Sequence, residues 1–222
     1  MTYGEYLGAW SAVTKWLYHL NSNPDDSSWN ASNWTRTWTP TYVDWMFWQG
    51  ASFNWSARRI NLPSNLWWNW GSWWTASLWM KVTSNPWYNT FSELFRLVEN
   101  ATKSAFVIGY FNNGWTIQVS WWRSRINVES ECVVNRDLND WKIYNIVATY
   151  TWTTNTVYLN WVSIGTSTSS WNWIGTHTSE GIINRNNLFN WWMDEVIAES
   201  KAWTATEVQK YYTMAKGRFG IT

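Results

Sequence analysis

The sequence predicts an all-β fold, with antiparallel strands in a sandwich or barrel and one short helix near the C-terminus. From Ala51 onward, short runs rich in β-branched and aromatic residues alternate with clusters of turn-forming residues. The runs show partial alternation of apolar and polar positions, and the turn clusters recur at the close spacing of all-β domains. One stretch near the C-terminus has helical periodicity instead.

The predicted strands follow one another along the chain, each bounded by turn residues. They are Trp74–Val82, Ser92–Val98, Lys103–Phe111, Trp115–Val119, Ser124–Glu129, Ile143–Tyr150, Thr156–Asn160 and Trp192–Ser200. We find no internal repeat and no long linker, and sandwiches of this length are routinely single domains. We therefore predict one domain over residues 1–222, with its core at about residues 15–217.

The predicted helix lies in "TATEVQKYYTMAKG". Thr204 is the expected N-cap, and Glu207 is placed to complete a capping box. An apolar face follows at helical spacing, formed by Val208, Tyr211, Tyr212 and Ala215. Lys216 falls in the last turn, and Gly217 is the expected left-handed residue that ends the helix. We expect this helix to pack on the rim or the back of the sandwich.

Composition and charge exclude several classes of function. The net charge is +1, with 16 basic and 15 acidic residues and no basic run, which argues against a nucleic acid partner. A single cysteine, Cys132, excludes an internal disulfide framework and a cysteine-built zinc site. No apolar run approaches the ~20 residues that span a membrane. "MTYGEYLGAW" lacks the pattern of a signal peptide, although a fragment of a longer exported protein would hide that signal.

Tryptophan is the anomaly of this composition, because the chain has 26 Trp and 11 Gly. Ten of the tryptophans lie among Asn, Asp, Ser and Thr or in an expected turn: Trp29, Trp34, Trp45, Trp48, Trp55, Trp141, Trp152, Trp161, Trp171 and Trp191. Several of them directly follow Asn or Asp, and glycine there would create Asn-Gly and Asp-Gly turns, the strongest short hairpin signal. By contrast, Trp79, Trp115 and Trp203 occupy positions that suit an indole, and Trp10 is a further candidate.

We therefore hypothesise that most of the turn tryptophans are glycine in the natural protein. The UGA codon is read as tryptophan in some genetic codes and as glycine in a few bacterial lineages, so a mismatched translation table would create this pattern. The alternative is a tryptophan-rich surface that binds sugars or was designed.

With that interpretation, five stretches resemble the laminin-G-like, concanavalin A-like lectin/glucanase superfamily, in its bacterial and phage branch. They are "LYHLNSNPDDSSWNASNWT" (Leu17–Thr35), "FWQGASFNWSARRINLP" (Phe47–Pro63), "ASLWMKVTS" (Ala76–Ser84), "NDWKIYNIVATYTWTTNTVYLNWVSIG" (Asn139–Gly165) and "FNWWMDEVIAESKAWTATEVQKYYTMAKG" (Phe189–Gly217). The resemblance implies a jelly roll of two antiparallel sheets. It does not select a function, because this fold serves binders, adhesins and hydrolases.

The resemblance also implies a structural calcium ion between an early loop and the last strand. Asp26 and Asn30 match the loop positions, and Asp194 matches the strand position. Calcium binds six to eight hard oxygens from carboxylates, amides and backbone carbonyls, which these residues and an irregular loop can supply. The alternative is that Asp26 makes an Asx-turn and that Asp194 is a solvated charge at a strand end.

Hydrolases of this fold carry two carboxylates that alternate on one strand. Glu129 and Glu131 stand beside Cys132, and Asp194, Glu195 and Glu199 lie in the last strand, but neither group has the expected alternation. We therefore predict that the chain is not an enzyme.

We expect His19 to be a packed strand residue and Cys132 to be an inert thiol. The sequence offers several possible sugar contacts without selecting one: Tyr88, Tyr110, Asn112, Asn113, Trp115, Arg123 and Ile183–Asn187.

These observations predict a non-catalytic module that binds a glycan or a cell-surface protein. It would belong to a larger extracellular or phage-surface protein with flanking domains, and it would hold a structural calcium ion. Two alternatives stay open, a glycoside hydrolase or lyase of the same fold and a structural spacer in an adhesin or tail fibre.

Overall fold

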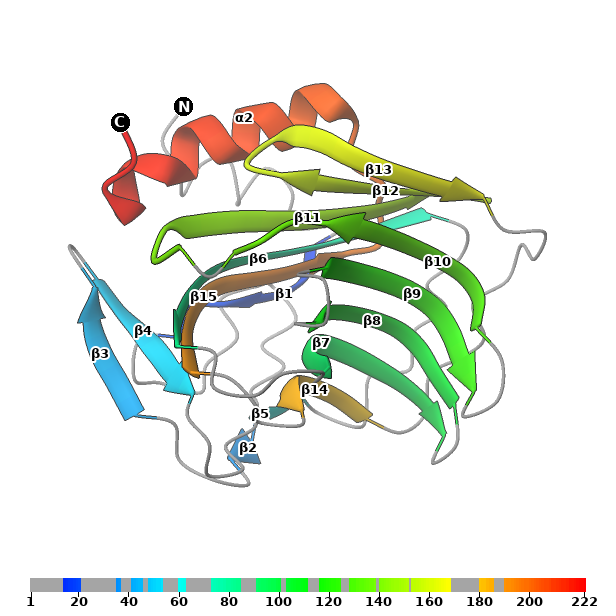
Figure 1. The fold of residues 1–222 in the computed structure, drawn as a ribbon, viewed down its shortest axis with the longest axis horizontal. Coiled ribbons are helices and arrows are strands. Elements are labelled where there is room, and N and C mark those ends of the chain that lie inside the picture. The colour runs from blue at the N-terminus through cyan, green and yellow to red at the C-terminus, as the bar shows by residue number, and fades with distance from the viewer. Residues whose placement is uncertain are drawn as a thin grey trace.

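Two antiparallel sheets face each other in the structure, a computed structural model (Figure 1). It describes residues 14–20, 35–36, 41–45, 48–53, 60–62, 73–84, 91–100, 103–111, 116–124, 128–138, 140–151, 153–168, 180–185 and 190–222. Within these residues, sheet A has the order β13-β12-β11-β6-β15-β4-β3, with β1 also paired to β15, and sheet B has the order β10-β9-β8-β7-β14-β5-β2. The predicted fold class, a two-sheet antiparallel jelly-roll sandwich with one short C-terminal helix, is confirmed.

Each sheet collects strands from distant parts of the chain. Sheet A contains β1 (Thr14–Tyr18), β3 (Thr41–Trp45), β4 (Trp48–Phe53), β6 (Trp73–Ser84), β11 (Ile143–Thr151), β12 (Thr154–Leu159), β13 (Val162–Thr168) and β15 (Asn190–Glu199). Sheet B contains β2 (Thr35–Arg36), β5 (Ile60–Leu62), β7 (Phe91–Asn100), β8 (Lys103–Phe111), β9 (Thr116–Ser124), β10 (Val128–Asn135) and β14 (Glu180–Arg185).

Most predicted strands are present, several of them longer than predicted, but two boundaries are wrong. Lys103–Phe111 has the predicted bounds as β8, whereas the single strand predicted at Ser124–Glu129 does not exist. β9 ends at Ser124 and β10 begins at Val128, because the chain reverses here and Val128 pairs with Arg123 in a hairpin. The expected loop at residues 183–187 begins inside a strand, since β14 runs to Arg185.

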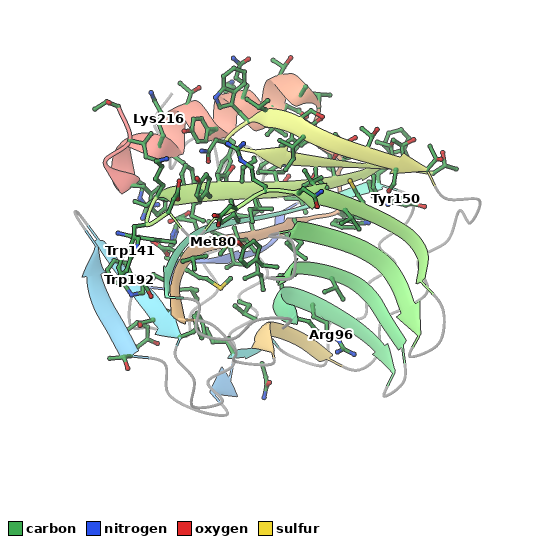
Figure 2. The ribbon with its side chains drawn as sticks, viewed as in Figure 1. Met80, Arg96, Trp141, Tyr150, Trp192 and Lys216 are labelled. Carbon is green, nitrogen blue, oxygen red and sulfur yellow. The ribbon has the colours of Figure 1, made fainter. Side chains whose placement is uncertain are left out.

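Alternation along β6 shows how the sequence assigns the two faces of sheet A. Its even-numbered apolar residues point between the sheets, where they join the main core: Trp74, Ala76, Leu78, Met80 and Val82. Figure 2 labels Met80 on this strand. The odd-numbered residues face the opposite side, and Trp79 among them belongs to a second core between sheet A and the C-terminal helix. Both faces of sheet A are therefore covered over much of its width.

The helix α2 (Ala205–Ala215) forms as predicted and lies on the outer face of sheet A (Figure 1). The capping box is complete, because the Thr204 N–H donates to Glu207 Oε2 at 2.8 Å and the Glu207 N–H donates to Thr204 Oγ1 at 3.3 Å. The predicted apolar face is the buried one, with Val208, Tyr211, Tyr212 and Ala215.

The predicted end of the helix at Gly217 is wrong. The chain continues as a short 3₁₀ helix, η1 (Lys216–Phe219), and the left-handed residue is Gly220, with φ of 68°. Through this extension, the Phe219 ring stacks on the Trp79 ring, with 4.2 Å between the ring centroids and an angle of 15° between the ring planes. Burial of this aromatic ring is a sufficient reason for the helical path to continue past Gly217.

Two of the ten turn tryptophans have the backbone conformation that favours glycine. Trp161 has φ of 68° and follows Asn160, which has φ of 49°. Together they form the two-residue turn between β12 and β13, and a type I′ turn requires positive φ at both of these positions. Trp141 has φ of 65°. At both tryptophans the left-handed conformation brings the Cβ atom too close to the backbone carbonyl oxygen that follows, which destabilises the fold. Glycine has no Cβ atom and would avoid this contact.

The other eight turn tryptophans do not share this evidence. Trp45, Trp48 and Trp191 are strand residues without positive φ, so the prediction that they lie in turns needing glycine is wrong. Trp45 and Trp48 pair with each other at the turn end of the β3–β4 hairpin, as the last residue of β3 and the first of β4. Five lie outside the described residues: Trp29, Trp34, Trp55, Trp152 and Trp171. Of the tryptophans expected to be authentic, Trp79 and Trp203 are buried, and Trp10 and Trp115 lie outside the described residues.

We expect Trp161→Gly to stabilise the fold. A left-handed backbone costs a side-chain-bearing residue roughly 1–2 kcal/mol, and the indole of Trp161 regains little of this because 42% of its surface is exposed. We expect a gain of about 1 kcal/mol in the free energy of unfolding, measured by urea denaturation. Trp203→Gly is the matched control, and it should lose more than about 3 kcal/mol because that indole is buried. A loss of similar size in both variants would contradict the prediction.

Candidate ligand-binding groove

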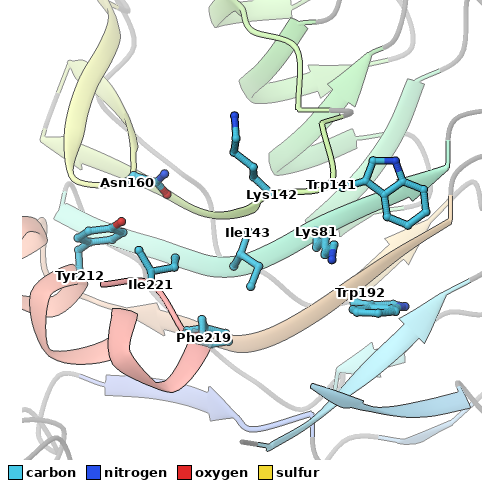
Figure 3. Close-up of a pocket in the computed structure, with 10 residues that line it drawn as sticks. Lys81, Trp141, Lys142, Ile143, Asn160, Trp192, Tyr212, Phe219 and Ile221 are labelled. Atoms are coloured by element: carbon cyan, nitrogen blue, oxygen red, sulfur yellow. The ribbon is translucent and has the colours of Figure 1, made fainter. Parts of the chain in front are cut away.

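A groove opens where the C-terminal helices stop covering the outer face of sheet A (Figure 3). Its volume is about 510 Å³. Sheet A, the segment before β11, the β12–β13 turn and the C-terminal residues contribute its lining: Lys81, Trp141, Lys142, Ile143, Asn160, Trp192, Tyr212, Phe219, Gly220 and Ile221. Trp141 and Trp192 come to the same end of sheet A from distant parts of the sequence (Figure 2).

The floor of the groove is one row of side chains across three strands. Lys81 on β6 is the register partner of Trp192 on β15 and of Ile143 on β11. Because directly opposed residues in antiparallel strands point to the same face, the three side chains lie side by side on the outer face. The Lys81 ammonium nitrogen consequently lies over the Trp192 ring, 5.1 Å from its centroid.

One rim of the groove is a tight turn before β11. Asp140 Oδ1 accepts a hydrogen bond from the Lys142 backbone N–H at 3.1 Å, and Oδ2 accepts from Lys142 Nζ at 2.7 Å and from the Tyr144 hydroxyl at 2.8 Å. Partial burial opposes ionisation of Asp140, but the hydrogen bonds from Lys142 and Tyr144 outweigh it and lower its pKa. This turn holds Trp141 with 61% of its surface exposed and its ring 5.8 Å from Lys81 Nζ.

The opposite wall is built by the C-terminus. Tyr212, Phe219 and Ile221 come from α2, η1 and the residues that follow (Figure 3). The Phe219 and Tyr212 rings both stack on Trp79, so this wall is fixed to the sheet by the second core. Asn160 also lines the groove, and its Oδ1 accepts the Asn145 backbone N–H at 2.9 Å.

The arrangement combines aromatic faces with a few polar groups, a combination that can contact a sugar chemically. Indole rings pack against the apolar faces of sugar rings, while amide, hydroxyl and ammonium groups bind hydroxyls. Trp192, Lys81, Tyr212 and Asn160 provide these groups in the groove. The sequence pattern alone does not mark Lys81 or Trp192 as site residues. Alternation in "WMKV" places Lys81 on the outer face, but its partner Trp192 follows only from the β6–β15 register.

The structure places Asp194, the strand residue predicted to bind calcium, in a buried cluster of charges. Only 2% of its surface is exposed, so the alternative of a solvated strand-end charge is wrong. Its Oδ1 accepts the backbone N–H of Leu20 at 3.0 Å and of Glu195 at 2.8 Å. Burial, with the nearby charge of Glu195, raises the pKa of Asp194 to about 7.

Glu195 lies in the same bulge of β15 with φ of 50°, and its carboxylate forms ion pairs with His19 and Arg218. Burial alone would lower the pKa of His19, but the hydrogen bond to Glu195 and the charge of Glu195 raise it overall. The prediction that His19 is a strand residue is wrong, since β1 ends at Tyr18 and His19 follows it.

The other two predicted calcium ligands, Asp26 and Asn30, lie outside the described residues. The structure brings Asp194 against Leu20, which stands shortly before the segment that contains both. Among the described residues, no group of three His, Cys, Asp or Glu side chains is placed to hold a metal ion.

Several other candidate residues have structural roles. Glu199 is buried and accepts a hydrogen bond from Trp203 Nε1 at 2.5 Å. Tyr110 is a core residue whose hydroxyl accepts the Leu138 N–H at 3.1 Å, so it is not a stacking platform for sugars. Cys132 is buried, and burial raises the pKa of its thiol. Of the remaining candidates, Tyr88, Asn112, Asn113 and Trp115 lie outside the described residues, as do the side chains of Arg123, Glu129 and Glu131.

The architecture is shared with toxin binding domains and with a domain of a bacterial arabinanase. The binding domain of Paraclostridial Mosquitocidal Protein 1 superposes with a TM-score of 0.73 at 16% identity, over 91% of this chain and 52% of that chain. Domain 4 of AbnA, a GH43 extracellular arabinanase from Geobacillus stearothermophilus in complex with arabinotriose, gives 0.68 at 16% identity, over 90% and 98%. Botulinum neurotoxin type C, whose cell entry depends on two ganglioside molecules, gives 0.73 at 10% identity, over 93% and 52%.

At these identities the likeness establishes the fold alone. The chain spans about half the length of the toxin chains and nearly all of the arabinanase domain. No protein-family model matches the sequence, and no curated protein matches it. Within the described residues, none of the helices is long and apolar enough to cross a membrane.

Proposed function

We propose that this chain is a non-catalytic carbohydrate-binding module and that the groove beside α2 is its binding site. The observation that carries the proposal is the cross-strand pair of Trp192 and Lys81 on the groove floor. It offers an aromatic surface and a cation side by side on a rigid sheet, with the Asn160 and Tyr212 side chains also lining the groove.

The structural neighbours support a glycan as the partner. Domain 4 of the arabinanase was solved with arabinotriose, and the botulinum toxin of type C depends on gangliosides. The arabinanase is extracellular and the botulinum toxin enters cells, which supports an extracellular or virion-surface setting and a larger parent protein. A cell-surface protein is the alternative partner.

The two other candidate functions have less support. A hydrolase or lyase needs a carboxylate pair that reaches substrate, whereas Glu195 and Glu199 are buried and bound to protein groups. A structural spacer would have no use for a groove with an indole and an ammonium group on its floor.

We propose kinship with the laminin-G-like, concanavalin A-like superfamily. We also propose that the tryptophans with left-handed backbone conformation are glycine in the natural protein, which accounts best for their positive φ angles. The supporting observation is positive φ at Trp141 and Trp161, where an Asp or Asn precedes and glycine would complete a common turn. We expect TGA codons at both positions in the coding DNA, and TGG codons there would refute the decoding proposal. The groove proposal does not depend on it, since Trp192 has ordinary strand geometry.

Calcium at Asp194 remains part of the proposal. A buried carboxylate beside Leu20 suits an ion that would connect the last strand to the segment with Asp26 and Asn30, and all three side chains are the hard oxygen donors that calcium binds. We expect the melting temperature to rise in millimolar calcium and to fall in EDTA, and Asp194→Asn to remove most of this difference. An identical melting temperature in calcium and in EDTA would exclude the ion.

Trp192→Ala is the direct test of the binding site. We expect the affinity for the best ligand among arabinotriose, cellotetraose, chitotriose, lactose, sialyllactose and trigalacturonate to fall about tenfold or more, about 1.4 kcal/mol, because the stacking surface is lost. Isothermal titration measures the affinity, and an assay of reducing ends tests the same sugars for cleavage.

Trp73→Ala is the matched control. Trp73 is also on β6, 48% exposed, and eight residues from Lys81, which is roughly 26 Å along a strand. Its variant should bind like the wild type. Absence of binding by the wild type, or equal loss in both variants, would overturn the proposed site, and release of reducing ends would favour the hydrolase alternative.

A further inference from the structure

We propose that the groove selects saccharides that carry a carboxylate, as uronic and sialic acids do, and that Lys81 binds this group. The inference rests on the proposed function and specifies its ligand class. It comes from the charge balance of the groove and from the geometry of the Lys81 side chain.

Among the described residues that line the groove, two are lysines and none is acidic. Lys142 is neutralised, because its Nζ lies 2.7 Å from Asp140 Oδ2. The Lys81 side chain has no such partner, since its Nζ makes no ion pair and no hydrogen bond with any described residue. The described part of the groove therefore presents one uncompensated positive charge.

The position of this charge is set by the sheet. Lys81 and Trp192 are directly paired across β6 and β15, and the ammonium nitrogen lies 5.1 Å from the centre of the indole. This contact with the ring stabilises the cation in the groove while leaving its three N–H donors available. A sugar ring packed beside the indole would bring a carboxylate on that ring within reach of the ammonium group. The ion pair would gain strength from the apolar side chains around it, Ile143, Phe219 and Ile221.

A single cation also limits the kind of anion. Nucleic acids and highly sulfated chains need several clustered basic residues, because each bound anionic group is matched by a charge. The described residues of the groove include one uncompensated lysine, and the whole chain has a net charge of +1. An isolated carboxylate on an otherwise neutral saccharide matches this balance, whereas a polyanion does not.

The test compares sugars that differ only in their charge. Sialyllactose and trigalacturonate are each measured against their own methyl esters, by isothermal titration with the full chain. We expect the acidic sugar of at least one pair to bind about tenfold more tightly, and the difference to shrink in high salt, which needs no variant to observe. Lys81→Gln should abolish the difference, and Lys81→Arg should retain it.

Lys210→Gln is the matched control, because Lys210 is an exposed lysine of α2 that does not line the groove. It should leave the preference for the acidic sugar intact. Equal affinity of the wild type for both members of each pair would overturn the acidic preference and leave the proposed function standing. A preference that survives Lys81→Gln would overturn the role of Lys81, and absence of binding to every sugar would overturn the proposed function itself.

Discussion

Burial of Trp79 between sheet A and the C-terminal helices is the contact on which the outer half of the molecule depends. Its side chain is fully buried, stacks on Tyr212 and Phe219, and donates from Nε1 to the Tyr211 hydroxyl at 2.9 Å. An indole buries about 150–250 Å², worth roughly 4–6 kcal/mol of transfer free energy. The helical segment ends at Phe219, directly over Trp79. Lys81 is the next residue of β6 on the outer face, and it therefore lies at the edge of the surface that the C-terminal helices cover. The groove is therefore a direct result of where this aromatic cluster ends.

The buried ion pairs of Glu195 also hold the C-terminal wall of the groove in place. A lone buried carboxylate would be costly, and here both its partners come from distant segments, His19 from the N-terminal part and Arg218 from η1. The bulge in β15 allows this, because the left-handed Glu195 interrupts the alternation of the strand between Asp194 and Ile197. Arg218 immediately precedes Phe219 in the groove wall, so the charge cluster and the second core position the same short segment.

The sequence predicted those parts of the structure that depend on local pattern. The capping box at Thr204 and Glu207 and the alternation of β6 are local, and both are present as predicted. The end of the helix was not predictable from Gly217, because the ring of Phe219 has a partner 140 positions earlier in the chain, Trp79. The groove was missed for the same reason, since the pairing of Lys81 with Trp192 and Ile143 depends on strand register. The single-domain prediction and the roles of Asp26 and Asn30 stay predictions.

Gly165 makes it possible for the two sheets to meet along one side. β10 and β13 are the outermost strands of different sheets, and a Cβ atom on Gly165 would lie 2.7 Å from Val134 Cγ2 and 2.9 Å from Cys132 Sγ. Without a side chain there, β13 packs directly against these β10 side chains. An uncovered outer strand offers unpaired backbone groups to other chains and promotes intermolecular association. A side chain at Gly165 would push β13 away from β10 and so open the sandwich along the side where both outermost strands lie.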